Sequence, residues 1–363
     1  MRFIQIAHAI TKDDAASRQL LNMDAMLREL GYATEMFAHK VDDRLVNQVK
    51  SMEAFSADRE DIVIYHMTTG TSFNAWVANY PHKIVLFYHN ITPAKFFFGN
   101  AWGSWWKCIK GRRQLKKIVK NSFFAWGASE YSRKELESLG LKHTRKMSIV
   151  VEPDKYTGYA PVQELVNKYD DGVTTLLMVG RGVPHKKLDE AIEAVAWYAA
   201  NISTDIRLVL AGNIKPSYGK RLHKMVKELD VTDNVIFTGQ ISNEELCTWY
   251  RLTDVVLSLS EHEGFCVPLV EGMIFDKPVV AYDCSAVPET LGEAGVLIKE
   301  KSPRTIATTI HQLLGNEVRL AALKKGRKKR LQELSYSRLM EQFRADIEEI
   351  IQLKAALSET DGD

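Results

Sequence analysis

The chain has 363 residues, a length that predicts two domains rather than one. Hydrophobic residues make up 45% and charged residues 26%, as in an ordinary globular enzyme, and the net charge of +2 excludes a strong global attraction to anionic partners. The four cysteines are widely spaced, no apolar run reaches about 18 residues, and Met1–Ala7 resembles a strand rather than a signal peptide. These features predict reduced thiols, a cytoplasmic location and no membrane span.

Alternating apolar strands and helices predict a doubly wound α/β sheet in the first half of the chain. Apolar residues recur at helical spacing over 15–30, and Gly31 suits the end of that helix. Asp13 and Asp14 precede this helix, where capping explains them. A further helix is expected over 130–139. The expected strands are Arg2–Ala7, Ala33–Ala38, Asp61–Tyr65, Lys83–Tyr88, Phe123–Ala128 and Met147–Val151.

Two histidines follow neighbouring predicted strands, His66 after 61–65 and His89 after 83–88. Ligands of doubly wound sheets bind beyond the carboxyl ends of the strands, so both histidines are expected at the active edge. A lone histidine there is usually structural. We favour a functional role for His89 and leave His66 open between the two interpretations.

Residues 94–120 combine six aromatic side chains with eight cations and contain no Asp or Glu. Aromatic rings beside a basic run are typical of a segment that lies at a membrane interface. Alternatively, the rings pack into the core and the cations form a solvated helix face. Nucleic-acid binding is a third interpretation, although nothing here resembles a known module. We favour contact with an anionic membrane surface or a lipid carrier through 95–120, and expect no nucleic acid as a partner.

After a linker that contains Gly158 and Pro161, the second half repeats the pattern of strands and helices. Strands are expected at Thr174–Val179, Arg207–Ala211, Val235–Phe237 and Val255–Ser260, and a long amphipathic helix at Tyr336–Leu357. The loop after the first of these strands reads GRGVPHKK over 180–187. Gly180 and Gly182 keep this turn open, and Arg181 and Lys186 place two cations where a leaving diphosphate could be neutralised.

The most distinctive stretch follows the strand at Val255–Ser260. Gly264 permits a sharp turn, Pro268 suits the first turn of a helix, and Pro278 requires that helix to end by about Asp276. Such a helix start presents free backbone N–H groups to an anion, here those of Val267, Leu269 and Val270. The carboxylates Glu263 and Glu271 bracket it and could accept hydrogen bonds from pairs of hydroxyl groups. An ordinary strand–turn–helix with two solvated glutamates is the alternative.

Residues 263–289 resemble the donor-site signature of the retaining GT-B glycosyltransferases of family 4. Their sequence is EGFCVPLVEGMIFDKPVVAYDCSAVPE. Glu263 and Glu271 match the two glutamates of that signature, and Pro288–Glu289 matches its trailing pair. Arg181 and Lys186 match the family's G-R-x-x-x-x-K signature upstream. The chain departs from the family at four positions: Lys187, Cys266 and Asp276 stand where glycine is usual, and Gly272 where alanine is usual.

The resemblance implies two facing Rossmann-like domains and transfer of a hexose from a UDP- or GDP-linked sugar to a glycan or lipid-linked acceptor, with retained configuration, in surface polysaccharide or glycolipid assembly. It implies catalytic roles for His89, Arg181, Lys186 and Glu263. It places Gly180, Gly239, Leu246, Phe265, Cys266, Val267, Leu269 and Glu271 around the donor nucleotide. The one Asp-x-Asp triplet, Asp361–Asp363, lies in the polar tail, so we expect no metal and no cofactor.

The resemblance also implies the domain plan. We expect an acceptor-side domain over 1–160, a domain that binds the donor nucleotide over 161–335, and a helix over 336–363 that crosses back to the first domain. Location at the inner face of the membrane would follow from a lipid-linked acceptor. Two alternatives stay open: a GT-B sugar-nucleotide epimerase or phosphorylase, and a non-catalytic sugar-nucleotide-binding subunit.

Overall fold

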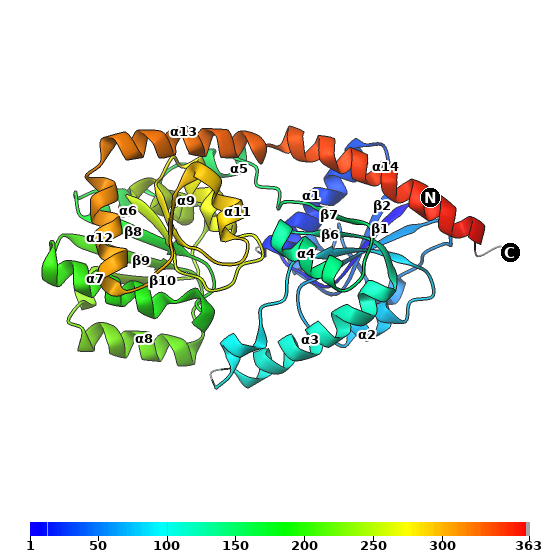
Figure 1. The fold of residues 1–363 in the computed structure, drawn as a ribbon, viewed down its shortest axis with the longest axis horizontal. Coiled ribbons are helices and arrows are strands. Elements are labelled where there is room, and N and C mark those ends of the chain that lie inside the picture. The colour runs from blue at the N-terminus through cyan, green and yellow to red at the C-terminus, as the bar shows by residue number, and fades with distance from the viewer. Residues whose placement is uncertain (13, 100, 361–363) are drawn as a thin grey trace. The chain divides into compact units, whose positions relative to one another are not determined.

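The computed structural model describes residues 1–12, 14–99 and 101–360 and divides the chain into two compact units (Figure 1). Unit 1 consists of Met1–Val150 together with the chain from Tyr336 onward, and unit 2 is Val151–Ser335. Residues 151–160, which we assigned to the first domain, therefore belong to unit 2. Asp13, for which we expected a capping role, lies outside the described residues.

The sheet of unit 1 is parallel throughout, with strand order β3-β2-β1-β4-β5-β6-β7. Its order reverses between β1 and β4, the point at which doubly wound sheets bind ligands. The strands are β1 (Phe3–Ile10), β2 (Thr34–Val41), β3 (Lys50–Ser51), β4 (Ile62–Met67), β5 (Ile84–Tyr88), β6 (Ser122–Gly127) and β7 (Thr144–Lys146).

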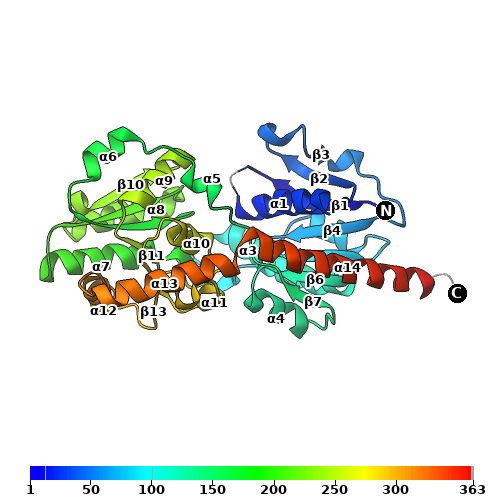
Figure 2. The same ribbon diagram turned by 90° about the horizontal axis from the view of Figure 1, so that it is seen from above.

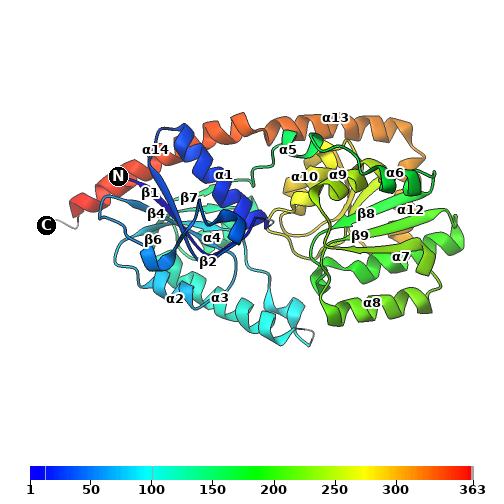
Figure 3. The ribbon, with the colours of Figure 1, turned by 180° about the vertical axis from the view of Figure 1, so that it is seen from behind.

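Helices cover both faces of this sheet. Helix α1 (Ala15–Glu29) and helix α14 (Tyr336–Thr360) lie on one face, and α2 (Phe73–Ala78), α3 (Trp102–Lys120) and α4 (Glu130–Ser138) lie on the other (Figures 1 and 3). Short 3-10 turns occur at Asp43–Leu45, Met52–Ala54 and Ala94–Phe97. Asp14 caps α1, since its carboxylate accepts a hydrogen bond from the amide of Ser17.

The last helix belongs to unit 1, as the sequence predicts for a helix that crosses back. The Trp126 indole nitrogen on β6 donates to Asp346 Oδ2 at 2.7 Å, and the Trp126 ring lies 5.7 Å from the ring of Phe343. Both aromatic rings are fully buried. The alternation of strand side chains explains the match: Phe124 and Trp126 share the face that α14 covers, while Ala125 points to the other face. Figure 2 shows α14 lying over β6.

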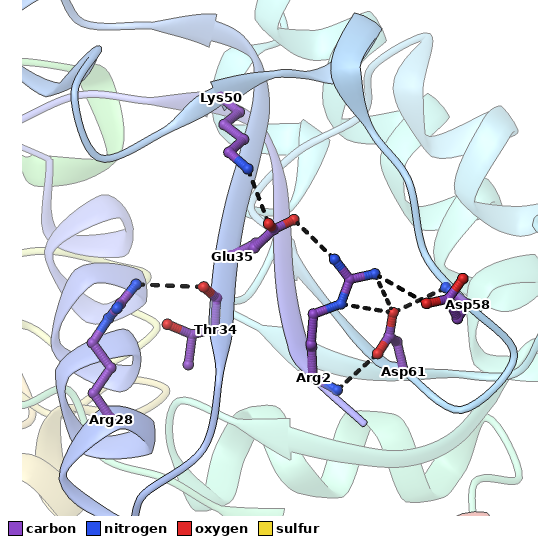
Figure 4. Close-up of polar contacts among 7 residues, drawn as sticks. All are labelled: Arg2, Arg28, Thr34, Glu35, Lys50, Asp58 and Asp61. Carbon is purple, nitrogen blue, oxygen red and sulfur yellow. Dashed lines mark hydrogen bonds and ion pairs between the residues drawn. The ribbon is translucent and has the colours of Figure 1, made fainter.

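Ion pairs hold the amino ends of the strands of unit 1 (Figure 4). The Arg2 guanidinium, just before β1, lies 2.6 Å from the Asp61 carboxylate, just before β4. Glu35 on β2 lies 3.5 Å from Arg2 and 2.9 Å from Lys50. Asp58 adds a longer contact to Arg2, at 3.6 Å. This cluster lies at the amino ends of the strands. The carboxyl ends, where doubly wound sheets bind ligands, lie at the opposite edge of the sheet.

Unit 2 contains a second parallel sheet, of order β10-β9-β8-β11-β12-β13. Here the order reverses between β8 and β11, so the loops after these two strands flank the switch point. The strands are β8 (Thr174–Val179), β9 (Ile206–Ala211), β10 (Val235–Gly239), β11 (Val255–Ser258), β12 (Val279–Tyr282) and β13 (Val296–Ile298).

The helices of unit 2 also form two layers, because successive apolar residues of each strand face opposite sides. Leu176 and Leu208 face the layer that contains α7, α8 and α12, whereas Leu177 and Val209 face α9, α10 and α11. The helices are α5 (Asp154–Thr157), α6 (Gln163–Tyr169), α7 (Leu188–Asn201), α8 (Pro216–Glu228), α9 (Asn243–Leu252), α10 (Val267–Ile274), α11 (Val287–Leu291), α12 (Pro303–Leu314) and α13 (Glu317–Glu333), with 3-10 turns at Pro184–Lys186, Thr232–Asn234 and Gly292–Ala294.

One strand prediction is wrong. The last strand of the first sheet is Thr144–Lys146, which pairs with Ala125–Gly127, and the apolar run Met147–Val151 follows it outside the ladder. This run is nevertheless buried, and burial rather than strand pairing explains its composition. In the described part of the chain, no helix is both long and apolar enough to cross a membrane.

Candidate functional site

The switch point of unit 2 brings together the two loops that the sequence analysis singled out. The loop after β8 carries Lys186, and the loop after β11 carries Glu263. Lys186 Nζ lies 2.5 Å from Glu263 Oε1, and the two side chains are 22% and 10% exposed. The amide of Glu263 also donates to Ser285 Oγ at 2.8 Å, which fixes the backbone of its loop. The parallel sheet thus joins two segments that are 77 residues apart in the chain.

Both members of this pair are charged. Burial opposes the ionisation of Glu263, but the charge of Lys186 and the hydrogen bonds from Lys186 and Ser260 outweigh it and lower the pKa of Glu263. Burial likewise disfavours the Lys186 ammonium, but attraction to Glu263 wins and raises the pKa of Lys186. The site therefore holds a fixed ammonium–carboxylate pair at neutral pH.

A recess within unit 2 is lined by this pair together with Gly180, Arg181 and Cys266. Arg181 is exposed and has no ion-pair partner among the residues that the structure describes. Gly212 permits a close approach of its loop to Gly180, because a Cβ on Gly212 would lie 2.2 Å from the Gly180 carbonyl oxygen. The Gly212 amide in turn donates to the Gly239 carbonyl at 3.0 Å, so Gly180 and Gly239 share this sheet edge.

Three of the four departures from the family signature have a common backbone property. Lys187, Cys266 and Asp276 all have positive φ, of 57°, 78° and 53°, and glycine is the residue that adopts this conformation without strain. The family's glycines at these places are thus explained by geometry. Gly272, where the family has alanine, is explained by space, since a Cβ would lie 3.0 Å from Val256 Cγ2.

Charged contacts accompany two of the strained positions. Asp276 pairs with Arg327 and Lys324, each at 2.7 Å. Lys187 belongs to a four-charge network in which it lies 3.0 Å from Glu190 and 3.4 Å from Glu261. The partner cation of that network, Lys301, lies 2.9 Å from Glu190 and 3.0 Å from Glu261. Lys187 is therefore held by side-chain pairing in a conformation that its backbone disfavours.

Glu271 has partners that the sequence did not indicate. Its Oε1 accepts from the Tyr156 hydroxyl at 2.8 Å, and its Oε2 accepts from the Tyr250 hydroxyl at 2.7 Å. The carboxylate is buried, with 3% of the residue exposed. Each carboxylate oxygen retains a further lone pair, so Glu271 could still accept hydrogen bonds from a diol. Any such ligand must share the carboxylate with two tyrosines.

Helix α10 begins at Val267, as expected, but its amides are not all free. The Leu269 amide donates to the Cys266 carbonyl at 3.2 Å, so the expectation of a free N–H at Leu269 is wrong. The tight turn follows from the left-handed conformation of Cys266 at the helix cap. Phe265 and Cys266 are buried, and the Phe265 carbonyl accepts from Thr290 Oγ1 at 2.6 Å. Leu246 lies on α9, half-buried against the core beside α10.

In unit 1, His66 and His89 lie at the carboxyl ends of β4 and β5, as the sequence predicted. His66 Nδ1 lies 3.1 Å from His89 Nε2, and His66 Nε2 lies 2.9 Å from Gln5 Oε1. His66 is buried and His89 is half-buried. The role of His66 was open between structural and functional on the sequence alone, and Gln5 was not predicted, because nothing in the primary structure signals a contact between β1 and β4.

Helix α3 divides the aromatic and basic segment between core and solvent. Its buried face contributes Cys108, Leu115, Ile118 and Val119, and Phe97 is buried just before it. Phe98, Trp102 and Trp106 are 60%, 55% and 59% exposed. Arg112 lies 2.5 Å from Glu135 and also donates to the Ile91 carbonyl, so it is structural. The interpretation that the aromatic rings of this segment pack into the core is therefore wrong for three of the six.

Comparison with known proteins shows which families contain similar sequences. Residues 164–330 match the family model described as glycosyl transferases group 1. This region contains Arg181, Lys186, Glu263 and Glu271. The chain is 30% identical over 148 residues to D-inositol 3-phosphate glycosyltransferase of Streptomyces bingchenggensis, and 25% identical over 167 residues to the serotype-specific mannosyltransferase WbdA of Escherichia coli.

These matches cover 38% and 45% of this chain but only 32% and 20% of the two relatives, so the chain spans less than two thirds of each. Among solved structures, Anabaena HepE in complex with UDP and glucose superposes with a TM-score of 0.75 at 15% identity, over 96% of this chain and all of that one. Likeness at this identity shows the fold, which is that of the GT-B proteins.

Proposed function

We propose that this protein is a retaining, metal-independent hexosyltransferase of family 4 that uses a nucleoside-diphosphate sugar. The observation that carries the proposal is the charged pair of Lys186 and Glu263 at the switch point of unit 2, beside the exposed guanidinium of Arg181. Cations at a strand end stabilise a departing diphosphate, and a fixed carboxylate orients sugar hydroxyls. The group 1 match over the same residues supports this interpretation.

The proposed roles follow from the contacts of each side chain. Arg181 and Lys186 neutralise the charge that develops on the leaving diphosphate, which a metal ion supplies in other enzymes. Glu263 accepts hydrogen bonds from the donor sugar while Lys186 holds its Oε1. Glu271 accepts from the ribose diol in competition with Tyr156 and Tyr250. His89 contacts the sugar near its anomeric end. Full turnover in the presence of a chelator is the expected result.

The donor is proposed to be a UDP- or GDP-linked hexose. HepE, which shares the fold, binds UDP and glucose, and WbdA is a mannosyltransferase. A thermal-shift screen of UDP, GDP and ADP sugars tests the donor class directly. We expect one nucleotide family to raise the melting temperature in the wild type, and the Lys186→Ala variant to lose this rise. If none of the nucleotide sugars raised the melting temperature of the wild type, the proposal would be contradicted.

Product analysis separates the alternatives. A transferase yields a new glycoside on the acceptor, whereas an epimerase yields an altered sugar nucleotide and a phosphorylase yields a sugar phosphate. A non-catalytic binding subunit yields none of these and does not hydrolyse the donor. The charged pair favours catalysis, because a binding subunit has no need of a buried ammonium beside the carboxylate that would contact the sugar.

We further propose that the acceptor is a lipid-linked glycan and that the exposed face of α3 rests on the inner, anionic surface of a membrane. Residues at helical spacing place Trp102, Trp106, Lys110, Arg113, Lys117 and Lys120 on one stripe, all of them exposed. Exposed indoles at one end of the stripe suit the headgroup region, and the cations suit anionic lipid. No Asp or Glu interrupts the segment.

Vesicle sedimentation tests this surface. We expect binding to vesicles of phosphatidylcholine with phosphatidylserine, weakened by salt and absent with phosphatidylcholine alone. Replacing Lys110, Arg113 and Lys117 with serine removes roughly 3 kcal/mol, at about 1 kcal/mol per cation. A matched control replaces the exposed Lys220, Lys325 and Lys328, which lie on helices α8 and α13. Equal losses in both triple variants would contradict a role for α3, as would wild-type protein that stays in the supernatant.

A further inference from the structure

Gln5, His66 and His89 lie on one face of the sheet of unit 1. The register pairs Ala7 with His66 and His66 with Phe87. Side chains two residues apart on a strand share a face. Gln5 on β1 therefore lies on the same face as Ala7 and its partner His66. His89, just beyond β5, likewise lies on the same face as Phe87. The His66 ring stacks on the Phe87 ring, at 5.2 Å and 10° between planes.

The direction of each hydrogen bond along this row can be assigned. Gln5 Nε2 donates to the Leu20 carbonyl at 3.1 Å, so Gln5 Oε1 is the atom that faces His66. An amide oxygen only accepts, hence His66 Nε2 carries a proton and donates at 2.9 Å. A neutral imidazole has one N–H, so His66 Nδ1 is a lone pair. It must accept from His89 Nε2 at 3.1 Å, which leaves His89 Nδ1 without a proton.

The surroundings keep both rings neutral, as this assignment requires. Burial lowers the pKa of His66 well below its usual value, and a positive charge on His89 would lower it further. Burial also lowers the pKa of His89, to about 4, against a small opposing effect of the Asp14 carboxylate. His89 is half-buried, and no hydrogen-bond donor to its Nδ1 occurs among the residues that the structure describes.

We propose that Gln5 and His66 are positioning residues that fix His89 in the Nε2–H tautomer, so that His89 Nδ1 acts as a hydrogen-bond acceptor for a substrate hydroxyl group. A lone pair on a neutral ring attracts an O–H and repels phosphate oxygens. The ligand group at His89 is therefore a sugar hydroxyl and not the diphosphate. The choice of a sugar hydroxyl rests on the proposed function, whereas the tautomer does not.

Nitrogen-15 NMR of the histidine rings in the free protein tests the tautomer without any assay of activity. We expect His89 to show a protonated Nε2 and an unprotonated Nδ1 at pH 7. Gln5→Glu places a carboxylate beside His66 and favours its doubly protonated form, which turns His66 Nδ1 into a donor. His89 should then move its proton to Nδ1. A wild-type His89 with the proton on Nδ1 would overturn the proposal.

Activity tests the acceptor role. With UDP-glucose or the donor that the thermal-shift screen identifies, we expect Gln5→Glu to lower kcat/KM about tenfold or more, while the rise in the melting temperature of the whole protein on nucleotide binding stays unchanged. Gln19→Leu is the matched control, since Gln19 is equally buried on α1 but bonds to the Val150 amide and not to a histidine. A shifted tautomer with unchanged kcat/KM would refute the acceptor role. Wild-type protein inactive with every donor would refute the proposed function, while the NMR result would still decide the tautomer.

Discussion

Lys186 and Glu263 form an ion pair with 2.5 Å between Nζ and Oε1, although one follows β8 and the other follows β11. The pair exists because β8 and β11 are neighbours at the point where the strand order of unit 2 reverses. Each charge keeps the other ionised in a place where burial would neutralise it. The candidate site therefore carries both charges without a ligand, and the proposed transfer reaction would use them as preorganised electrostatics.

Lys186→Ala is expected to reduce both stability and turnover, because it leaves the buried Glu263 without its cation. Breaking a fully buried pair costs about 3–5 kcal/mol, and we expect about 2 kcal/mol for this partly exposed one. Arg181→Ala is the control, since the exposed Arg181 should affect turnover alone. Denaturant unfolding and single-turnover kinetics measure the two effects. Equal losses of donor affinity and rate would contradict stabilisation of the leaving group.

Glu271→Gln is expected to weaken the binding of the bare nucleoside diphosphate by roughly 1–3 kcal/mol, the effect of one lost charge-assisted partner. Tyr156→Phe should have the opposite effect, because it frees Glu271 Oε1 from the hydroxyl that now occupies it. We expect binding up to about tenfold tighter, which corresponds to one net hydrogen bond. Isothermal titration calorimetry measures both. Unchanged affinity in both variants would rule out Glu271 as a nucleotide ligand.

Cys266→Gly is expected to be more stable than Cys266→Ala by about 1 kcal/mol, the opposite of the order of these residues in a helix interior, because Cys266 is the left-handed N-cap of α10. Both variants lose the thiol from its buried position beside Ser258, but only glycine adopts the φ of 78° without strain. Chemical denaturation of the two variants gives the comparison. An alanine variant as stable as the glycine variant would show that the left-handed conformation is not strained.

Asp346→Asn is expected to stabilise the protein by about 1–3 kcal/mol at pH 8. Burial raises the pKa of Asp346 from 3.8 to about 6. A raised pKa contributes stability that is fully present below about pH 4 and is lost as the pH rises through 6. Asparagine avoids the buried charge and still accepts from the Trp126 indole. Melting curves from pH 4 to pH 8 should show the gain appear between these limits, and a gain that persists at pH 4 would exclude titration of Asp346 as its cause.

Most of the sheet could be predicted from the sequence, because buried parallel strands are short apolar runs. The strand at Thr174–Val179 was predicted with its observed bounds. The failure at Met147–Val151 shows the limit of this signal, since a buried segment outside the ladder has the same composition as a strand. Hydrogen bonding to a neighbouring strand cannot be inferred from hydrophobicity alone.

The charged residues of the site were also predictable, since Arg181, Lys186 and Glu263 stand in loops directly after strands. Their partners were not. Tyr156 reaches Glu271 across 115 residues of sequence, and Gln5 reaches His66 across 61. Such contacts depend on which strands and helices become neighbours, and a single sequence does not specify this order.

The interruption of unit 1 has a consequence for biosynthesis. A ribosome that has made Met1–Val150 must complete the whole of unit 2 before it reaches Tyr336, which takes roughly ten to forty seconds at about 5–20 residues per second. Until then Trp126, fully buried in the finished protein, lacks Phe343 and Asp346. Unit 2 is continuous in sequence and can fold first. A nascent chain therefore carries an uncovered aromatic surface, which a chaperone could bind and which a stop codon at Ser335 would make permanent.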